Sequence, residues 1–191
     1  MTPLTTLSSR AIPLPLENID TDQIIPARFL KATTREGFGD HLFCDWRFDQ
    51  HGNHIRSFVL NDPTWRGEIL IAGKNFGCGS SREHAAWALA DFGFRIVISS
   101  FFADIFRNNA LNNGILPIQV NQDLLEDWLE KVQNKPDSIF ELDLDAQTIS
   151  LGEQLVSFDI NPYKKTCLMN GYDDIDYLLS LTDKIEAFEP G

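Results

Sequence analysis

The sequence predicts an α/β fold, and three observations support this prediction. Between residues 68 and 133, short apolar runs alternate with longer segments of helical periodicity, a pattern typical of parallel β–α units. Residues 139–160 instead alternate apolar and acidic side chains, as antiparallel strands do. The chain has 191 residues, of which 43% are hydrophobic, which is enough to bury the core of one domain.

The N-terminal part begins with a predicted strand over residues 11–16, whose two prolines fit an edge or entry strand. Residues 18–22 have the polar composition of a turn, and the apolar pair at 24–25 follows. No period is sustained over residues 32–67, which predicts a long functional loop. A cluster of aromatic and apolar residues within it predicts a short helix near 38–46.

The middle of the chain is regular. The predicted strands are 68–73, 95–99 and 115–120, and the predicted helices that follow them are 81–92, 101–112 and 122–133. The second helix should end at Asn112-Asn113-Gly114, a typical C-terminal stop. Apolar residues on one face of the third helix predict that it packs against the sheet.

The C-terminal part predicts two or three antiparallel strands over residues 139–160. The tail, 162–187, predicts one or two helices interrupted at Asn170-Gly171. We therefore expect a single domain over residues 1–160 and a helical extension over residues 161–191.

The net charge of −12 is unevenly distributed. Residues from 121 onward include 16 acidic and 5 basic side chains, whereas residues 1–120 include 12 acidic and 11 basic ones. Because the sequence has no basic stripe, nucleic acid is not expected as a partner. An anionic substrate is compatible with the chain, since eight of its nine arginines lie at or before Arg95.

The sequence shows neither a targeting signal nor a membrane-spanning segment. No apolar run approaches the roughly 20 residues of a membrane-spanning helix, and the N-terminal residues have no signal-peptide core. We therefore expect a cytoplasmic protein with no membrane partner. Cys44, Cys78 and Cys167 are widely spaced without a C-x-x-C pair, so we expect this chain alone to build neither a zinc site nor an iron–sulfur cage.

The most informative segment is Gly77-Cys78-Gly79-Ser80-Ser81-Arg82-Glu83-His84, between a predicted strand and a predicted helix. Glycines allow a sharp turn and a close approach of the backbone to a ligand. Two hydroxyls and a guanidinium then stand where a helix begins, and helix N-termini attract anions. These residues predict a site for a small carboxylate or phosphate. Ser80 and Glu83 also match a capping box, which would serve only to start the helix.

Common nucleotide and hydrolase motifs do not fit this segment. Arg82 stands where the dinucleotide fingerprint needs its third glycine, and no Gly-Lys-Ser/Thr follows for a P-loop. Cys78 could be a reactive thiol at a helix N-terminus or a small packing residue.

Four motifs occur in a fixed order: Asn18-Ile19-Asp20-Thr21-Asp22-Gln23, Phe38-Gly39-Asp40-His41-Leu42-Phe43, Gly77 to His84, and Gly114-Ile115-Leu116-Pro117. In these motifs, and over nearly its whole length, the chain resembles the small subunits of isopropylmalate dehydratases in the aconitase superfamily. The resemblance implies a three-layer β/β/α swivel domain that closes over an active site carried largely by a separate large subunit. That subunit would bring a [4Fe–4S] cluster and form a heterodimer or heterotetramer with this chain.

The implied reaction interconverts 2-isopropylmalate and 3-isopropylmalate through dehydration to isopropylmaleate and rehydration, in leucine biosynthesis. Carried over by motif, Ser80 would be the general base, Ser81 and Arg82 would hold a substrate carboxylate, and Asp22 would be a supporting active-site acid. A helix N-terminus contributes at most about 2 kcal/mol and a charge-assisted hydrogen bond about 1.5–3 kcal/mol. Because this does not ionise a serine at neutral pH, we expect Ser80 to act only in the closed complex.

Substrate selection is expected in the loop after Asp22. Ile24 and Leu30 could contact the isopropyl group and Arg28 could bind a carboxylate, or the isoleucine could simply be core. Two alternatives remain open. One is the small subunit of a related hydro-lyase, of the homoaconitase or citraconate/methylmalate type. The other is a non-catalytic anion-binding regulatory module, which a Ser80→Ala variant would distinguish by leaving activity intact.

Overall fold

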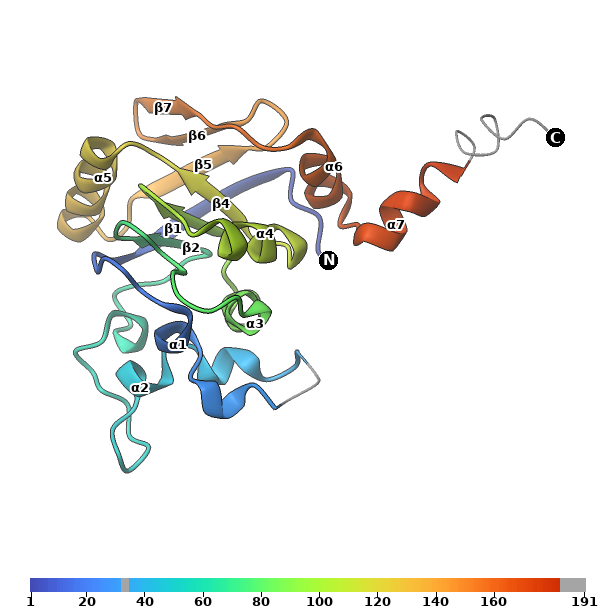
Figure 1. The fold of residues 1–191 in the computed structure, drawn as a ribbon. Helices are drawn as coiled ribbons and strands as arrows, with labels where there is room; N and C mark the ends of the chain where they lie inside the picture. The colour runs from blue at the N-terminus through green and yellow to red at the C-terminus, as the bar shows by residue number, and fades with distance from the viewer. Residues whose placement is uncertain (32–34, 183–191) are drawn as a thin grey trace.

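The computed structural model describes residues 1–31 and 35–182, and its centre is a curled seven-stranded sheet in the order β4-β3-β2-β1-β5-β6-β7 (Figure 1). The strands are β1 (Thr6–Leu14), β2 (Ile69–Ala72), β3 (Ile96–Ser99), β4 (Leu116–Gln119), β5 (Ile139–Asp143), β6 (Thr148–Leu151) and β7 (Gln154–Ser157). Neighbours from β4 to β1 are parallel, and neighbours from β1 to β7 are antiparallel.

Strand β1 joins the two halves of the sheet. Its residues 11–14 pair in parallel with β2, whereas its residues 6–10 pair antiparallel with β5. The prediction of a strand over 11–16 therefore located only the half of β1 that pairs with β2. Residues 6–10 are largely exposed and polar, so they gave no apolar run by which to recognise them.

The helices are α1 (Thr21–Ile24), α2 (Cys44–Arg47), α3 (Glu83–Phe92), α4 (Asp104–Asn112), α5 (Gln122–Asn134), α6 (Pro162–Asn170) and α7 (Asp174–Leu179), with 3₁₀ helices η1 (Ala27–Phe29), η2 (Phe38–His41) and η3 (Val59–Asn61). The regular β–α alternation of the sequence is confirmed, because β2–α3, β3–α4 and β4–α5 follow one another as predicted.

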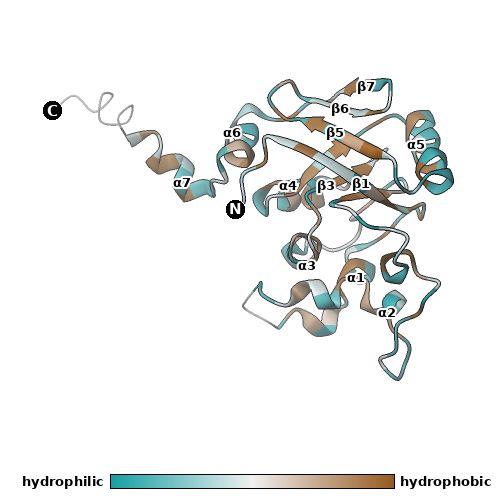
Figure 2. Ribbon diagram, turned by 180° about the vertical axis from the view of Figure 1, so that it is seen from behind, coloured by the Kyte–Doolittle hydropathy of each residue, from teal (hydrophilic) through white to brown (hydrophobic). Residues whose placement is uncertain are grey.

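Two hydrophobic cores lie on opposite faces of the parallel strands. Successive residues of a strand point to opposite faces, so Ile69 packs with Trp128 of α5 and Phe140 of β5 in one core. Leu70 packs in the other core with Ala88 of α3. The layers of the antiparallel strands, the parallel strands and helices α3 and α4 give the expected β/β/α arrangement, and Figure 2 shows apolar colour along β5 in the middle of the sheet.

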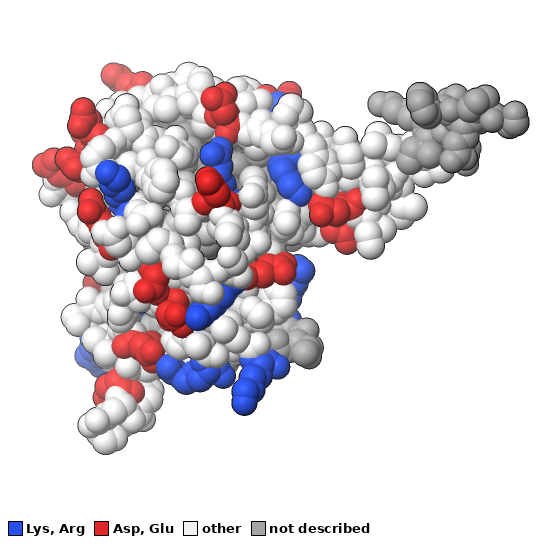
Figure 3. Space-filling view, in the orientation of Figure 1, with Lys and Arg blue, Asp and Glu red and all other residues white. Residues whose placement is uncertain are grey.

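The irregular segment after α1 contains the short helices η2 and α2, so the helix predicted near 38–46 is present in two pieces. It packs closely on α3, because the Gly39 N–H donates to the Asp91 carboxylate at 2.8 Å and a Cβ at Gly39 would lie 2.7 Å from the Phe92 nitrogen. Residues 32–34 of the predicted 32–67 loop lie outside the described residues. Figure 3 shows Lys and Arg side chains gathered at the lower end of the molecule, where this segment lies.

Helix α6 ends at Gly171, in the left-handed conformation at φ 72°, as the Asn170-Gly171 break predicts. Leu168 of α6 belongs to the core and its carbonyl accepts from the Leu4 N–H at 2.9 Å, so α6 is packed onto the body. Helix α7 projects away from the body (Figure 1). Residues 183–191 of the predicted extension lie outside the described residues, and the division at residue 160 stays a prediction. Among the described helices, none combines the length and apolar character needed to span a bilayer.

Candidate active site

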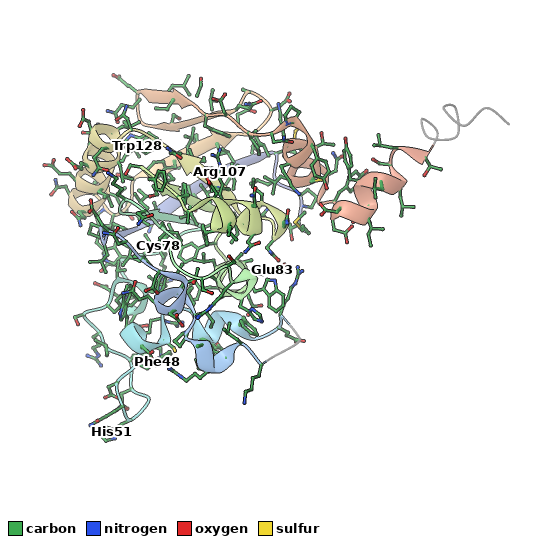
Figure 4. All side chains as sticks on the ribbon, viewed as in Figure 1. Phe48, His51, Cys78, Glu83, Arg107 and Trp128 are labelled. Carbon is green, nitrogen blue, oxygen red and sulfur yellow. The ribbon has the colours of Figure 1, made fainter. Side chains whose placement is uncertain are left out.

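The glycine loop, residues 77–82, connects the end of β2 to α3 and lies against the segment that leads into α1. The Ile19 carbonyl accepts from the N–H groups of Gly77 at 2.8 Å and Cys78 at 3.3 Å, and the Cys78 carbonyl accepts from the Thr21 N–H at 2.9 Å. Two of the motifs quoted from the sequence are thereby placed side by side, although about 60 residues separate them along the chain. Figure 4 labels Cys78 in this loop and Glu83 at the start of α3.

Helix α3 does not begin with the capping box that was predicted at Ser80 and Glu83. Arg82 is the N-cap of α3 and makes no side-chain capping bond, so that prediction is wrong. The Glu83 carboxylate instead accepts from the Asn113 side chain at 3.1 Å. A capping box does form at α1, where Asp20 and Gln23 exchange side-chain and backbone hydrogen bonds of 2.8 Å each. Consequently the hydroxyls of Ser80 and Ser81 are not used to start a helix, and both residues are exposed.

The backbone of Ser80 is held by a residue that the sequence analysis missed. The buried Thr21 hydroxyl donates to the Ser80 carbonyl at 2.9 Å, and the Arg82 N–H donates to the same oxygen at 2.8 Å. These two hydrogen bonds to the Ser80 carbonyl hold the backbone of the loop in place at the exposed serines. No local pattern distinguishes Thr21 from any turn threonine, because its partner lies 59 residues away.

Asp22 and Arg82, both predicted site residues, form an ion pair in which an Arg82 guanidinium N–H donates to the Asp22 carboxylate. The Arg82 side chain is 17% exposed and that of Asp22 is 53% exposed. The hydrogen bond from Arg82 is the largest influence that lowers the pKa of Asp22, and partial burial opposes it. Asp22 is therefore ionised at neutral pH and holds the guanidinium beside the glycine loop.

A cavity of about 280 Å³ opens at this loop. Its lining consists of Thr21, Gly77, Gly79, Ser80 and Arg82 on one side, and Ala103, Asp104, Ile105 and Phe106 on the other. Two backbone hydrogen bonds tie the walls together: the Phe76 N–H donates to the Phe101 carbonyl at 3.1 Å, and the Ala103 N–H donates to the Phe76 carbonyl at 3.3 Å. An open cavity lined by a largely buried guanidinium and the exposed residue Ser80 can hold a small anion, whereas Ser81 does not line this cavity.

None of the residues predicted for substrate selection, Ile24, Arg28 and Leu30, lines this cavity. Ile24 is fully buried in the core that faces α3, which favours the second interpretation given above, a packing residue. Arg28 donates to the Asp45 carboxylate, with one contact of 3.0 Å, and to the Cys44 sulfur at 3.1 Å. Leu30 is half-buried, and neither it nor Arg28 lines the cavity.

The cysteines give no reactive or metal-binding group. The Cys78 thiol donates to the Asn18 carbonyl at 3.4 Å, and burial, aided by the charge of Asp20, raises its pKa. This favours the packing interpretation over the reactive thiol. Burial likewise raises the pKa of Cys44 in α2 and Cys167 in α6. Within residues 1–31 and 35–182, no three His, Cys, Asp or Glu side chains come together as a metal site.

Comparisons with known proteins agree with this architecture. Residues 1–123 match the family model described as the aconitase C-terminal domain. The chain is 63% identical to the 3-isopropylmalate dehydratase small subunit of Cytophaga hutchinsonii, covering 96% of this chain and 92% of that protein. It is 50% identical to the one from Oceanobacillus iheyensis, covering 99% and 98%. A crystal structure of 3-isopropylmalate dehydratase from Methanocaldococcus jannaschii superposes with a TM-score of 0.68 at 27% identity, covering 96% of this chain and 99% of that one.

Proposed function

We propose a function from one premise: the chain belongs to the family of 3-isopropylmalate dehydratase small subunits, in the aconitase superfamily. On that premise it is the small subunit of a hydro-lyase of leucine biosynthesis and works with a large subunit. The observation that carries the proposal is the 63% identity over 96% of the chain. The exposed serines beside a held guanidinium support it from the geometry.

The proposed reaction moves a hydroxyl between neighbouring carbons. A proton leaves the carbon next to a carboxylate, the hydroxyl leaves the adjacent carbon, and water adds back with the two positions exchanged. In this chain Ser80 takes the proton, since its hydroxyl is exposed at the cavity and free of any capping role. Arg82 and Ser81 bind the substrate carboxylate, and Asp22 orients Arg82 through their ion pair.

The [4Fe–4S] cluster belongs to the large subunit in this proposal. The cysteines of this chain do not fit such a cage, because they lie apart in α2, the glycine loop and α6, and all three have a raised pKa. The groups that receive the departing hydroxyl are accordingly supplied by the partner.

The exposure of Ser80 explains why a partner is required. Its hydroxyl lies two residues before the N-cap of α3, and the field of a helix end falls off within a turn. The at most about 2 kcal/mol available there corresponds to about 1.5 pKa units, far short of ionising a serine in water. Closure against a large subunit would exclude water and strengthen every electrostatic contact to Ser80. We place the assembled enzyme in the cytoplasm, as a heterodimer or heterotetramer that light scattering would distinguish.

Reconstitution with the cognate large subunit tests the proposal. Under anaerobic conditions the pair should convert 3-isopropylmalate, with isopropylmaleate followed by its absorbance, while this chain alone should not. Ser80→Ala should lower kcat by about 10²–10⁴-fold, the range of a lost general base. It should leave the affinity of the two subunits unchanged.

Ser57→Ala is the matched control, because Ser57 is an exposed serine that does not line the cavity. Turnover of Ser80→Ala within a few-fold of the wild type would remove Ser80 as the base. A wild-type pair that ignores isopropylmalate but converts a malate with a carboxylate arm would instead indicate a homoaconitase-type enzyme.

A further inference from the structure

Helix α7 has an apolar face that is not used in either hydrophobic core of the described residues. Its residues Ile175, Leu178 and Leu179 are 68%, 58% and 66% exposed, and none of them packs against a core. Their i, i+3 and i+4 spacing places the three side chains on one face of the helix. A cluster of exposed aliphatic side chains within a single short helix is typical of a surface that another molecule covers.

The position of α7 is fixed by residues outside this apolar face. The Tyr177 ring packs edge-on against Tyr163 of α6, with ring centroids 4.4 Å apart. The Asp174 carboxylate accepts hydrogen bonds from the Tyr163 hydroxyl and from Lys164 Nζ, the latter at 3.2 Å. Lys164 Nζ also donates to the Asn112 side chain at the end of α4, at 2.6 Å. Because a helix of six residues is not stable by itself in water, these contacts hold α7 in place and leave its apolar face unpartnered.

The anchored end of α7 is close to the cavity at the glycine loop. A second cavity, of about 270 Å³, is lined by Ile175 of α7, Glu83 of α3 and Asn112 of α4. Glu83 directly follows Arg82, which lines the first cavity. Along α4, Ile105 of the first cavity and Asn112 of the second are about 10 Å apart, at 1.5 Å per residue. A standard interface covers about 800 Å² on each partner, a patch roughly 30 Å across, so a partner over the first cavity also reaches α7.

The charge around the apolar face indicates which partner it suits. Residues 172–182 include three carboxylates, Asp173, Asp174 and Asp176, and no basic side chain. Figure 3 shows acidic side chains grouped where α7 joins the body. Two copies paired through α7 would bring both sets of carboxylates together on chains that each have a net charge of −12, and an anionic membrane would be repelled in the same way. The face therefore suits a different protein, with an apolar groove bordered by basic side chains.

We infer that the apolar face of α7 is a docking surface for the large subunit. Ile175, Leu178 and Leu179 enter an apolar groove of that subunit, and basic side chains at its edge meet the carboxylates of α7. The inference rests on the proposed function, because that function requires the large subunit to cover the cavity next to α7. It assigns part of the affinity between the subunits to a helix that does not line the cavity at the glycine loop.

Calorimetric titration of the chain with its cognate large subunit, under anaerobic conditions, tests the inference. The double variant Leu178→Ser, Leu179→Ser should raise Kd about tenfold or more, the usual effect of truncating an interface anchor. When the large subunit is raised well above this Kd, kcat should return to the wild-type value, because α7 does not line the cavity. Leu155→Ser is the matched control, since Leu155 of β7 is 68% exposed and lines neither cavity.

Hydrogen exchange gives a second measurement that needs no variant. The large subunit should slow exchange of the α7 amides, whereas concentrating the chain alone should not. Thermal unfolding of the isolated chain should be the same for the wild type and the double variant, because the replaced side chains are exposed.

The inference is overturned if the double variant binds the large subunit as tightly as the wild type, if Leu155→Ser weakens binding equally, or if kcat stays low at saturation. A lowered unfolding temperature would show that the face packs on this chain itself, and would also overturn it. Light scattering that shows a wild-type dimer and a monomeric double variant would assign the face to a second copy instead. A wild-type pair that associates without converting isopropylmalate refutes the proposed function and leaves the binding result standing, so the two failures are distinguishable.

Discussion

Replacing Gly77 by alanine should destabilise the chain by about 2–5 kcal/mol, for two separable reasons. Gly77 has φ 74°, in the left-handed region, where a side chain costs about 1–2 kcal/mol. An alanine Cβ would also overlap the ring of Phe106, which is buried and packed against Phe76. Overpacking of this kind costs about 1–3 kcal/mol, because the buried ring must shift from its packing against Phe76.

Gly79→Ala separates the two contributions. Gly79 has φ 88°, so alanine suffers the same backbone strain, but the nearest heavy atom to its Cβ would be the Asp20 Cβ at 3.4 Å. This is an ordinary contact, and the expected loss is only about 1–2 kcal/mol. The difference between the two variants measures the packing of the glycine loop on α4.

Thermal unfolding of the isolated chain, followed by circular dichroism, is the assay. A chain of this size loses about 2–4 °C in Tm per kcal/mol, so Gly77→Ala should fall by about 4–20 °C and Gly79→Ala by less. Phe106→Leu should recover part of the loss when combined with Gly77→Ala, but not with Gly79→Ala. Equal decreases for the two glycine variants would refute the argument that Gly77 spaces the cavity walls.

The remaining predictions concern Thr21 and Cys78. Thr21→Val removes the hydroxyl that donates to the Ser80 carbonyl. It should lower the free energy of unfolding measured in urea by about 0.5–1.5 kcal/mol and lower kcat/KM several-fold. Thr21→Ser, which keeps the hydroxyl, should retain the stability and the kcat/KM of the wild type. Cys78 should be alkylated by iodoacetamide more slowly at pH 7–8 than a free thiol, because its raised pKa keeps it protonated there. Mass spectrometry should show a rate that still rises at the pH where an ordinary thiol levels off, because the pKa of Cys78 is raised, and a plateau below pH 8 would contradict this.

The elements that could be predicted from the sequence are those whose own residues show a regular hydrophobic pattern. Strands β2 to β4 are mainly apolar and are buried on both faces except at Gln119, and α5 has an apolar face that includes Trp128. Strand β1 was found only in part, because its first half is stabilised by pairing with β5, a partner more than 120 residues away. Pairing at that range leaves no pattern in the strand's own residues.

The candidate site was predictable to the same extent. Ser80, Ser81, Arg82 and Asp22 lie in recognisable motifs, and the ion pair between Arg82 and Asp22 brings the two motifs together. The sequence left Ile24 open between a substrate contact and a core residue, because burial is decided by the whole fold. Helix α1 has a single turn started by the Asp20 capping box, and that turn directs Ile24 into the core instead of toward the cavity.

The exposure of the cavity bears on why the proposed activity needs a second subunit. A catalytic serine must be shielded from water during proton transfer, yet every hydroxyl at this cavity belongs to an exposed residue except that of Thr21, which holds the loop. Backbone hydrogen bonds hold the loop against the segment before α1, and Phe76, which precedes the loop, is bonded to Phe101 and Ala103 ahead of α4. A movement of the loop over the cavity would break the bonds to the segment before α1. On the proposed function, the shielding comes from the large subunit docked over the cavity, to which Arg82 and Ser80 contribute groups already held in place.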